Sequence, residues 1–152
     1  MQAGDIVFVR GRTLMSALVR FFDPGRFTHV ALAVSATHIL EAQYMTRTRI
    51  ARLEAPDYEV VDLGLSPAQR VAVVLRGLDY IGTQYDYKQA FWYAARRLLR
   101  LKGPNRWDSP KYYICAEIVE KVLAEIEVIP DYVGIGSMTP NELYIYLLSR
   151  QK

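Results

Sequence analysis

Two kinds of hydrophobic pattern follow one another along the chain. The first third carries short apolar, β-rich runs, and the rest is dominated by apolar residues at helical spacing. The runs that predict strands are Asp5–Arg10, Thr28–Val34, His38–Tyr44 and Tyr58–Leu63. The two middle runs are joined through Ser35-Ala36, which indicates a β-hairpin.

Helical spacing recurs in five segments. They are Leu14–Phe22, a helix from Ser66 to Ile81, Tyr87–Leu101, a helix containing Cys115 that runs to Ile126, and a last helix from Thr139 through Leu148. Two of these segments open with the signature of a capping box, Ser66-Pro67-Ala68-Gln69 and Thr139-Pro140-Asn141-Glu142. Asp23-Pro24-Gly25 and Gly82 supply stop signals for the first two. Without a repeat or linker, we expect one α+β domain over residues 1–152.

Composition places the chain among ordinary globular proteins. It has 152 residues, of which 51% are hydrophobic and 23% charged, unlike a disordered chain. No apolar run approaches the roughly 20 residues that span a bilayer. The chain passes from Met1 directly into a strand-like run without a signal-peptide pattern. We therefore expect a cytoplasmic protein by default, although export by another route would leave no trace.

Cysteine and histidine counts limit the chemistry. A single cysteine excludes an intrachain disulfide and a multi-cysteine zinc site, and the two histidines make a poor metal site. We therefore expect neither a metal nor a cofactor. The net charge of +3 and the isoelectric point near 9.0 favour anionic partners, without choosing among cell-wall polymer, phospholipid and nucleic acid.

The predicted hairpin brings a histidine and an acid together. If the turn centres on Ser35, facing residues have numbers that sum to 70, so His29 lies opposite Glu41 and His38 points the other way. Directly opposite Cβ atoms are about 4.5–5.5 Å apart, within reach of a carboxylate–imidazole hydrogen bond. Such a carboxylate orients the ring and stabilises its protonated form. Alternatively, the pair has no catalytic role, and the acid only accompanies a half-buried histidine and keeps this strand face soluble.

Cys115 supplies a candidate nucleophile. It follows the apolar run Tyr112–Ile114 and precedes apolar residues at helical spacing. At a helix start the dipole and unpaired N–H groups favour a thiolate. If Ser109-Pro110 caps the helix instead, the effect weakens, and a lone cysteine beside apolar residues is commonly a core thiol. Together with the hairpin pair, however, Cys115 completes a set of nucleophile, base and orienting acid.

A family resemblance rests on these same residues. The segments that carry it are Thr28-His29-Val30-Ala31-Leu32, Ile39-Leu40-Glu41-Ala42 and Tyr113-Ile114-Cys115-Ala116-Glu117-Ile118-Val119. In this order they resemble the permuted branch of the NlpC/P60 (papain-like) superfamily. The likeness is to its YiiX/YaeF-like members, with lecithin:retinol acyltransferase-like proteins as relatives. The resemblance implies a circularly permuted papain-like fold, in which a small antiparallel sheet or barrel packs against helices.

Other short segments agree with the resemblance. Ala3–Val7 is similar to the opening Gly-Asp strand of the family, Gly82–Tyr87 to its Gly-x-Pro-Tyr-Asp segment, and Thr139-Pro140 to its last helix start. Two positions depart from the pattern: Ala116 stands in place of Ser after the nucleophile, and Gln84 in place of Pro. Neither departure removes a catalytic group.

The resemblance implies acyl chemistry. Cys115 would attack an acyl carbon and form an acyl-thioester, with His29 acting as base and then acid and Glu41 orienting the ring. The oxyanion would be held by preorganised donors, for which the backbone N–H of Cys115 and a hydroxyl of Tyr113 or Tyr112 are candidates. Tyr85-Asp86, in the Tyr-Asp segment of the family, would line the substrate cleft, whereas the residues by themselves indicate a structural anchor of a loop.

A basic segment carries the remaining candidate surface. Residues Lys88–Lys102 alternate five cations with aromatic and aliphatic residues. The pattern predicts an amphipathic helix with a solvated basic face, or contact of Phe91–Leu101 with an anionic lipid or wall surface. We expect no nucleic-acid binding, because no recognition motif accompanies the charges.

Three functions remain open at this point. The first is a cysteine amidase or peptidase that acts on a bacterial cell-wall peptide such as that of peptidoglycan. The second is a lipid acyltransferase or thioesterase with the same triad. The third is a non-catalytic ligand-binding module of the same fold, which the presence of all three triad residues disfavours.

Overall fold

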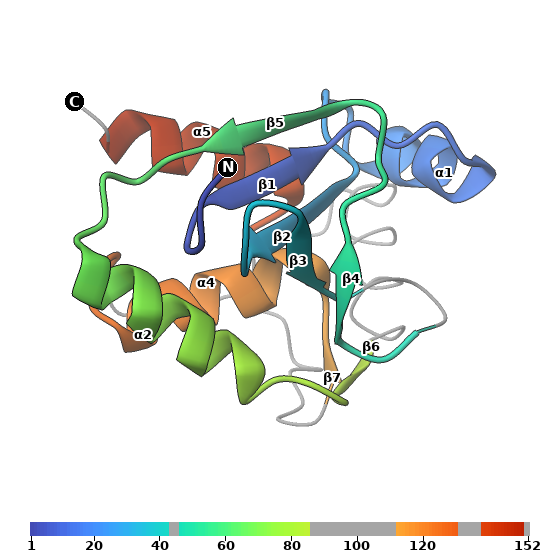
Figure 1. Ribbon diagram of the computed structural model, residues 1–152. Helices are drawn as coiled ribbons and strands as arrows, with labels where there is room; N and C mark the ends of the chain where they lie inside the picture. The colour runs from blue at the N-terminus through green and yellow to red at the C-terminus, as the bar shows by residue number, and fades with distance from the viewer. Residues whose placement is uncertain (43–45, 86–111, 131–137, 151–152) are drawn as a thin grey trace.

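The computed structural model describes residues 1–42, 46–85, 112–130 and 138–150. Its centre is a five-stranded antiparallel sheet in the order β4-β3-β2-β1-β5 (Figure 1). The strands are β1 (Ile6–Val9), β2 (His29–Ala33), β3 (His38–Glu41), β4 (Arg49–Arg52) and β5 (Tyr58–Val61). A separate parallel pair joins β6 (Gln84–Tyr85) to β7 (Tyr112–Tyr113). The predicted α+β class, with a small antiparallel sheet against helices, is confirmed.

The four described helices are α1 (Leu14–Phe22), α2 (Pro67–Leu78), α4 (Cys115–Glu125) and α5 (Pro140–Arg150). Two of them, α2 and α5, begin at the capping boxes that the sequence predicts. Both capping boxes form: Ser66 with Gln69, and Thr139 with Glu142. No helix of the described segments is long and apolar enough to cross a membrane. The helix expected over residues 87–101 lies outside the described residues.

Helix α2 ends earlier than the sequence pattern predicts. Its last residue is Leu78 rather than Ile81, because the backbone tightens into i→i−3 bonds such as Ile81 N–H to Leu78 O. Gly82 then adopts a φ of 85°, a left-handed conformation that suits glycine, and its N–H donates to Thr48 O. The end of α2 is thereby tied to the residues that lead into β4.

The sheet buries both of its faces, but against different partners. In β1 to β3, even-numbered residues such as Phe8 and Leu32 pack into the main core with α2, α4 and α5, where Val61 of β5 joins them. Odd-numbered residues form a smaller cluster on the other face, where Leu53 and Ala55 from the β4–β5 connection cover them. The smaller cluster consists of Val7, Val9, Ala31, Ala33 and Ile39. His29 and Glu41 are odd-numbered and belong to this second face.

The hairpin register differs from the expected one. Leu32 pairs with Leu40, and Ala33 with Ile39, so paired numbers sum to 72 rather than 70. The reason lies in the turn, where the Ser35 hydroxyl accepts from the N–H groups of Thr37 and His38 and lengthens the loop. The prediction that residues 29 and 41 lie directly opposite was therefore wrong.

His29 and Glu41 nevertheless lie on the same face of the sheet, as the sequence predicts. A change of two in the sum preserves the parity of facing residues, so His29 and Glu41 become diagonal neighbours on one face. Diagonal positions remain within reach of long side chains. His38 is exposed and bonds within its own turn, which confirms that it points away from this pair.

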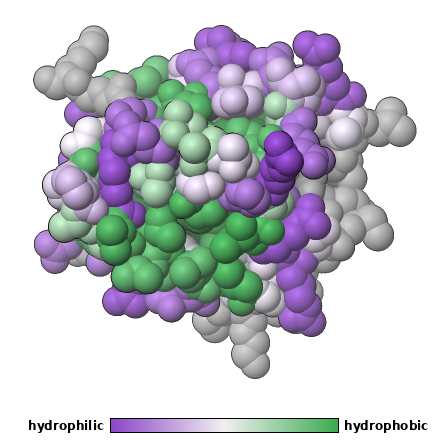
Figure 2. Space-filling view, in the orientation of Figure 1, coloured by the Kyte–Doolittle hydropathy of each residue, from purple (hydrophilic) through white to green (hydrophobic). Residues whose placement is uncertain are grey.

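Helix α2 also presents apolar side chains to solvent. Val71 and Leu75 are each 58% exposed, and Leu78 is 36% exposed. Figure 2 shows apolar side chains gathering at the surface over this helix. The stripe faces away from the sheet, so it contributes nothing to the described core or to the groove described below.

Gly77 gives a stability test of the packing between α2 and the sheet. It is buried near the end of α2, and an added Cβ would meet Leu32 and Leu40 at 3.4–3.8 Å, ordinary contact distances. Gly77→Ala is therefore expected to stabilise the fold by about 0.5–1 kcal/mol, because alanine loses less backbone entropy in a helix. Urea unfolding measures the change, and a loss of stability would show that the interface is tighter than described.

Candidate active site

Cys115 is the first residue of α4. The preceding Ile114 is the N-cap, with φ −95° and ψ 164°, and its carbonyl accepts the first helical bond from Ile118 N–H. No side chain caps this helix end. The thiol therefore stands at the positive end of the helix dipole rather than two turns inside the helix, which settles the alternative that the sequence left open.

A gap between two strands lets the thiol reach the other face of the sheet. The described pairs of β2 and β3 lie next to the turn, at Leu32–Leu40 and Ala33–Ile39, and they do not include Ala31 with Glu41. There the N–H of Val30 is directed at the sulfur of Cys115, as is the N–H of Ala116. The start of α4 thus lies against β2 at Val30.

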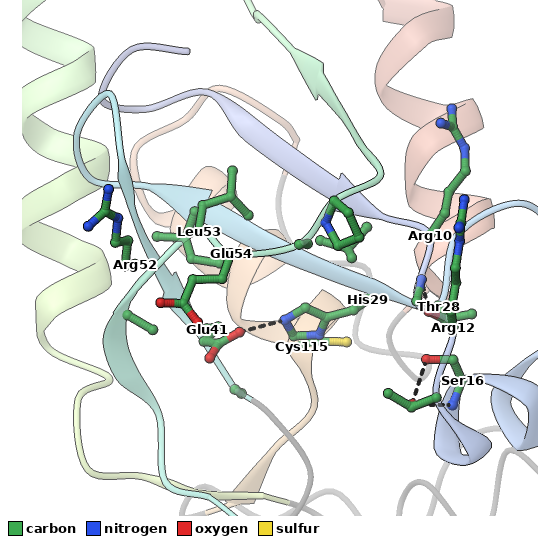
Figure 3. A pocket seen from close by; sticks show the side chains of 18 of the residues that line it. Arg10, Arg12, Ser16, Thr28, His29, Glu41, Arg52, Leu53, Glu54 and Cys115 are labelled. Atoms are coloured by element: carbon green, nitrogen blue, oxygen red, sulfur yellow. Dashed lines mark hydrogen bonds and ion pairs between the residues drawn. The ribbon is translucent and has the colours of Figure 1, made fainter.

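His29 joins the thiol to the acid. Its Nε2 lies 3.2 Å from Oε2 of Glu41, and the ring also hydrogen-bonds to Cys115. Because Nε2 bonds to Glu41, the ring nitrogen that bonds to the thiol is Nδ1. Figure 3 shows Glu41 on one side of the imidazole and the sulfur on the other. The structure thus brings together the three residues predicted as nucleophile, base and orienting acid.

Arg49 is a residue of this site that the sequence reasoning missed. It lies directly opposite Glu41 in the β3–β4 register and donates from Nε and Nη2 to Oε1 at 3.3 and 3.2 Å. One carboxylate oxygen of Glu41 is thereby held by Arg49 and the other by His29. The sequence shows an arginine at position 49, but only the β3–β4 pairing reveals that it faces Glu41.

The electrostatics of the three groups favour a thiolate–imidazolium pair. Burial alone lowers the pKa of His29, but hydrogen bonds and negative charge from Cys115 and Glu41 outweigh it and raise the pKa to about 10. Burial raises the pKa of Cys115, but His29 and the N–H groups of Val30 and Ala116 bring it below its ordinary value.

Glu41 remains ionised beside this pair. Burial raises the pKa of its carboxyl, whereas the bonds and positive charges of His29 and Arg49 lower it below its ordinary value. A buried carboxylate with both oxygens engaged stays fixed in orientation. The imidazolium of His29 is therefore supported on the side away from the sulfur.

The three residues open into a groove of about 770 Å³. The loop after β1, the first turns of α1, strands β2 to β4 and the β4–β5 connection line it. Much of the lining is apolar, and it includes Val9, Ile39 and Leu53. A partly exposed thiol and an apolar trough are what an enzyme needs to bring an acyl group to a nucleophile.

The predicted oxyanion and cleft residues are placed only in part. Tyr85 pairs with Tyr113 in the β6–β7 register, so the backbone of Tyr85 lies beside the strand that leads into Cys115. The backbone N–H of Cys115 belongs to the first turn of α4, where N–H groups lack helical acceptors. The roles of Tyr113, Tyr112 and Tyr85 stay predictions, and Asp86 lies outside the described residues.

Among known proteins, the likeness is one of structure. No family model matches the chain, and no curated protein matches it significantly. Among solved structures, the chain is similar to the metalloprotein YiiX from Escherichia coli O157:H7, with a TM-score of 0.62 and 20% sequence identity. The match covers 84% of this chain and 67% of that one. It confirms a YiiX-like, permuted papain-like fold.

Proposed function

Starting from this YiiX-like fold, we propose that the protein is a cysteine hydrolase that cleaves an amide bond, in a bacterial cell-wall peptide, through Cys115, His29 and Glu41. The observation that carries the proposal is the hydrogen-bonded series from thiol to imidazole to carboxylate at the floor of an open groove. This arrangement is that of a nucleophile with its base and its orienting group.

Acylation uses the ion pair already present. The Cys115 thiolate attacks the amide carbonyl carbon, a C–S bond forms, and the carbonyl electron pair moves onto oxygen. The N–H groups at the start of α4 supply donors for that oxyanion. When the tetrahedral adduct collapses, the C–N bond breaks, and the His29 imidazolium gives its proton to the departing amine. An acyl-thioester on Cys115 and a neutral His29 remain.

Deacylation reverses these roles with water. Neutral His29 takes a proton from water while the water oxygen attacks the thioester carbon, and the C–S bond then breaks. The acid product leaves, and the thiolate–imidazolium pair is restored. Glu41 holds the ring in one orientation in both steps and stabilises its charged form, and Arg49 fixes Glu41.

The proposed reaction needs no metal at these residues. YiiX is described as a metalloprotein. In the part of this chain that the structure describes, no cluster of three or more His, Cys, Asp or Glu side chains is placed to hold a metal. Both oxygens of Glu41 are already engaged, and the guanidinium of Arg49 beside it would repel a cation. The site therefore does not fit a metal.

A second candidate uses the same triad on lipid. The apolar lining of the groove suits an acyl chain as well as an apolar peptide side chain, which favours a lipid acyltransferase or thioesterase. The predicted lipid contact of residues 91–101 lies outside the described residues and stays a prediction. A ligand-binding module of this fold remains the alternative if Cys115 proves unreactive toward acyl donors.

Acyl transfer to Cys115 tests the proposal. With p-nitrophenyl acetate, we expect one nitrophenolate per protein in a burst and an acetyl group on the peptide that contains Cys115. Cys115→Ala should remove the burst and lower the rate by about 10³-fold or more, because no other described thiol is present. Equal rates in the two proteins, or acetylation at another residue, would contradict the proposal.

Release of new amines identifies the bond. Soluble peptidoglycan fragments treated with wild-type protein should gain free amino groups, and fragments treated with Cys115→Ala should not. If only phospholipid or thioester substrates react with wild-type protein, the lipid candidate replaces the amidase.

A further inference from the structure

The groove carries an excess of positive charge at one end. We propose, resting on the proposed function, that this end binds a carboxylate or phosphate group of the acyl substrate, with Arg12 as the contacting residue. The substrate class is then an acyl compound with an apolar portion in the trough and an anionic group next to the reacting carbonyl.

The charge of Arg12 is neutralised less by nearby carboxylates than the charge of Arg10. Arg10, Arg12 and Arg26 share the carboxylates of Asp57 and Glu59, so three cations meet two anions. Arg10 takes the shortest bond, 2.6 Å to Asp57, and also binds Glu59. Arg12 reaches only the second oxygen of Asp57, at 3.6 Å, and its side chain is 79% exposed. Such a long, solvated pair contributes little, which leaves the guanidinium free to bind a ligand.

The turn that carries Arg12 is fixed beside the catalytic histidine. The N–H of Gly11 donates to the Thr28 hydroxyl at 3.0 Å, and Thr28 immediately precedes His29. Arg20 donates to the carbonyl of Gly11 at 2.6 Å. A Cβ at residue 11 would lie 2.8 Å from the Thr28 hydroxyl, so the close approach requires glycine. Arg12 is therefore held at a defined place along the groove.

Arg12 also lies on the reacting side of the imidazole. Figure 3 shows Arg12, with Ser16 and Thr28, beyond the sulfur, whereas Arg52 and Glu54 lie toward Glu41. At that second end, Glu54 offsets the charge of Arg52 and Glu41 offsets that of Arg49. An anion that enters the groove is thus attracted toward the sulfur side, where the acyl carbon must sit.

Two alkylating reagents of nearly equal size can measure the electrostatic potential near the sulfur of Cys115 without a known substrate. Iodoacetate carries a carboxylate, and iodoacetamide is its neutral counterpart. The ratio of their alkylation rates at Cys115 reports the charge near the sulfur and cancels changes in the reactivity of the thiol itself. The measurement uses the full chain in three forms: wild type, Arg12→Gln, and Arg76→Gln. Arg76 is an exposed residue of α2 outside the groove lining, so its replacement is a matched loss of one charge.

We expect Arg12→Gln to lower the iodoacetate-to-iodoacetamide ratio about three- to tenfold, the effect of one partly screened charge near the sulfur. Added salt should reduce the wild-type ratio toward that of the variant. Arg76→Gln should keep the wild-type ratio. A ratio that is unchanged in Arg12→Gln, with iodoacetamide still reacting at the wild-type rate, overturns the assignment of Arg12. If neither reagent alkylates wild-type Cys115 below about pH 7, the proposed function itself fails.

Protection experiments separate the two sources of an anionic group. One arm uses a wall peptide with free carboxylates and its amidated form, and the other uses vesicles of phosphatidylglycerol and of phosphatidylcholine. We expect an anionic probe to slow alkylation by iodoacetamide more than its neutral counterpart, and this difference to shrink in Arg12→Gln. Protection in the first arm identifies a peptide carboxylate, and protection in the second identifies a lipid phosphate. Equal protection by charged and neutral probes overturns the proposal.

Discussion

Replacing His29 with alanine is expected to slow the alkylation of Cys115 by iodoacetamide at about pH 6 by roughly two orders of magnitude. In the wild type, His29 holds the pKa of the thiol below its ordinary value, so the reactive thiolate is present in weak acid. Without the imidazolium, the pKa returns toward about 8.5, and less than about one thiol in a hundred is ionised at that pH.

The second histidine provides a matched control for this experiment. His38 lies in the same hairpin, but it is exposed and bonds to Thr37 in the turn. His38→Ala should therefore alkylate at the wild-type rate. If His29→Ala also keeps the wild-type rate while it remains folded, Cys115 is a thiol that owes nothing to His29, and the catalytic account fails.

Glu41→Gln is expected to lower the rate of acyl transfer by about 10²- to 10⁴-fold. An amide has the shape of the carboxylate but no charge to stabilise the imidazolium. It can also present N–H groups to the ring and favour the wrong tautomer. The loss should fall on kcat more than on KM, because Glu41 acts on His29 rather than on the substrate.

The pH profile distinguishes this role from a structural one. Glu41 contributes to raising the pKa of His29 to about 10, so its removal should shift the alkaline limb of acylation to lower pH. Glu127→Gln, at an exposed position after α4, is a matched loss of charge that should leave the profile unchanged. A Glu41→Gln protein that is slower at every pH without this shift would indicate general damage to the site.

The hairpin shows what sequence reasoning can and cannot locate. Alternation along strands placed His29 and Glu41 on one face, and that inference depends only on parity. The register depended on the length of the turn, which the hydroxyl of Ser35 sets through bonds to Thr37 and His38. Local turn chemistry of this kind is invisible to a hydrophobic pattern.

Strand β4 was missed because it is short and lies mostly at the surface. Its four residues, Arg49–Arg52, are mostly exposed, and two of them are arginines. Pairing with β3 rather than burial makes this segment a strand. Once it is in place, Arg49 lies opposite Glu41. The β6 and β7 strands were missed for a related reason, since each has only two residues.

The start of α4 is a case in which the tertiary structure decides. The sequence allowed a helix that begins at Cys115 or one capped by Ser109-Pro110. The helix starts at the cysteine because Ile114 is extended and directly follows β7, which pairs with β6. The roles proposed for Tyr113, Tyr85 and Asp86 stay predictions, as does the single domain over residues 1–152.

The ionisation of Cys115 in the wild-type protein tests the central claim most directly. The ultraviolet absorbance of the thiolate, followed from about pH 3 to pH 10 with Cys115→Ala as the blank, gives the apparent pKa of the single thiol. We expect a thiolate that persists well below the ordinary pKa of about 8.5, paired with a charged His29. Ionisation at about 8.5 or above would instead show an ordinary buried thiol, and the chain would be a binding module of the same fold.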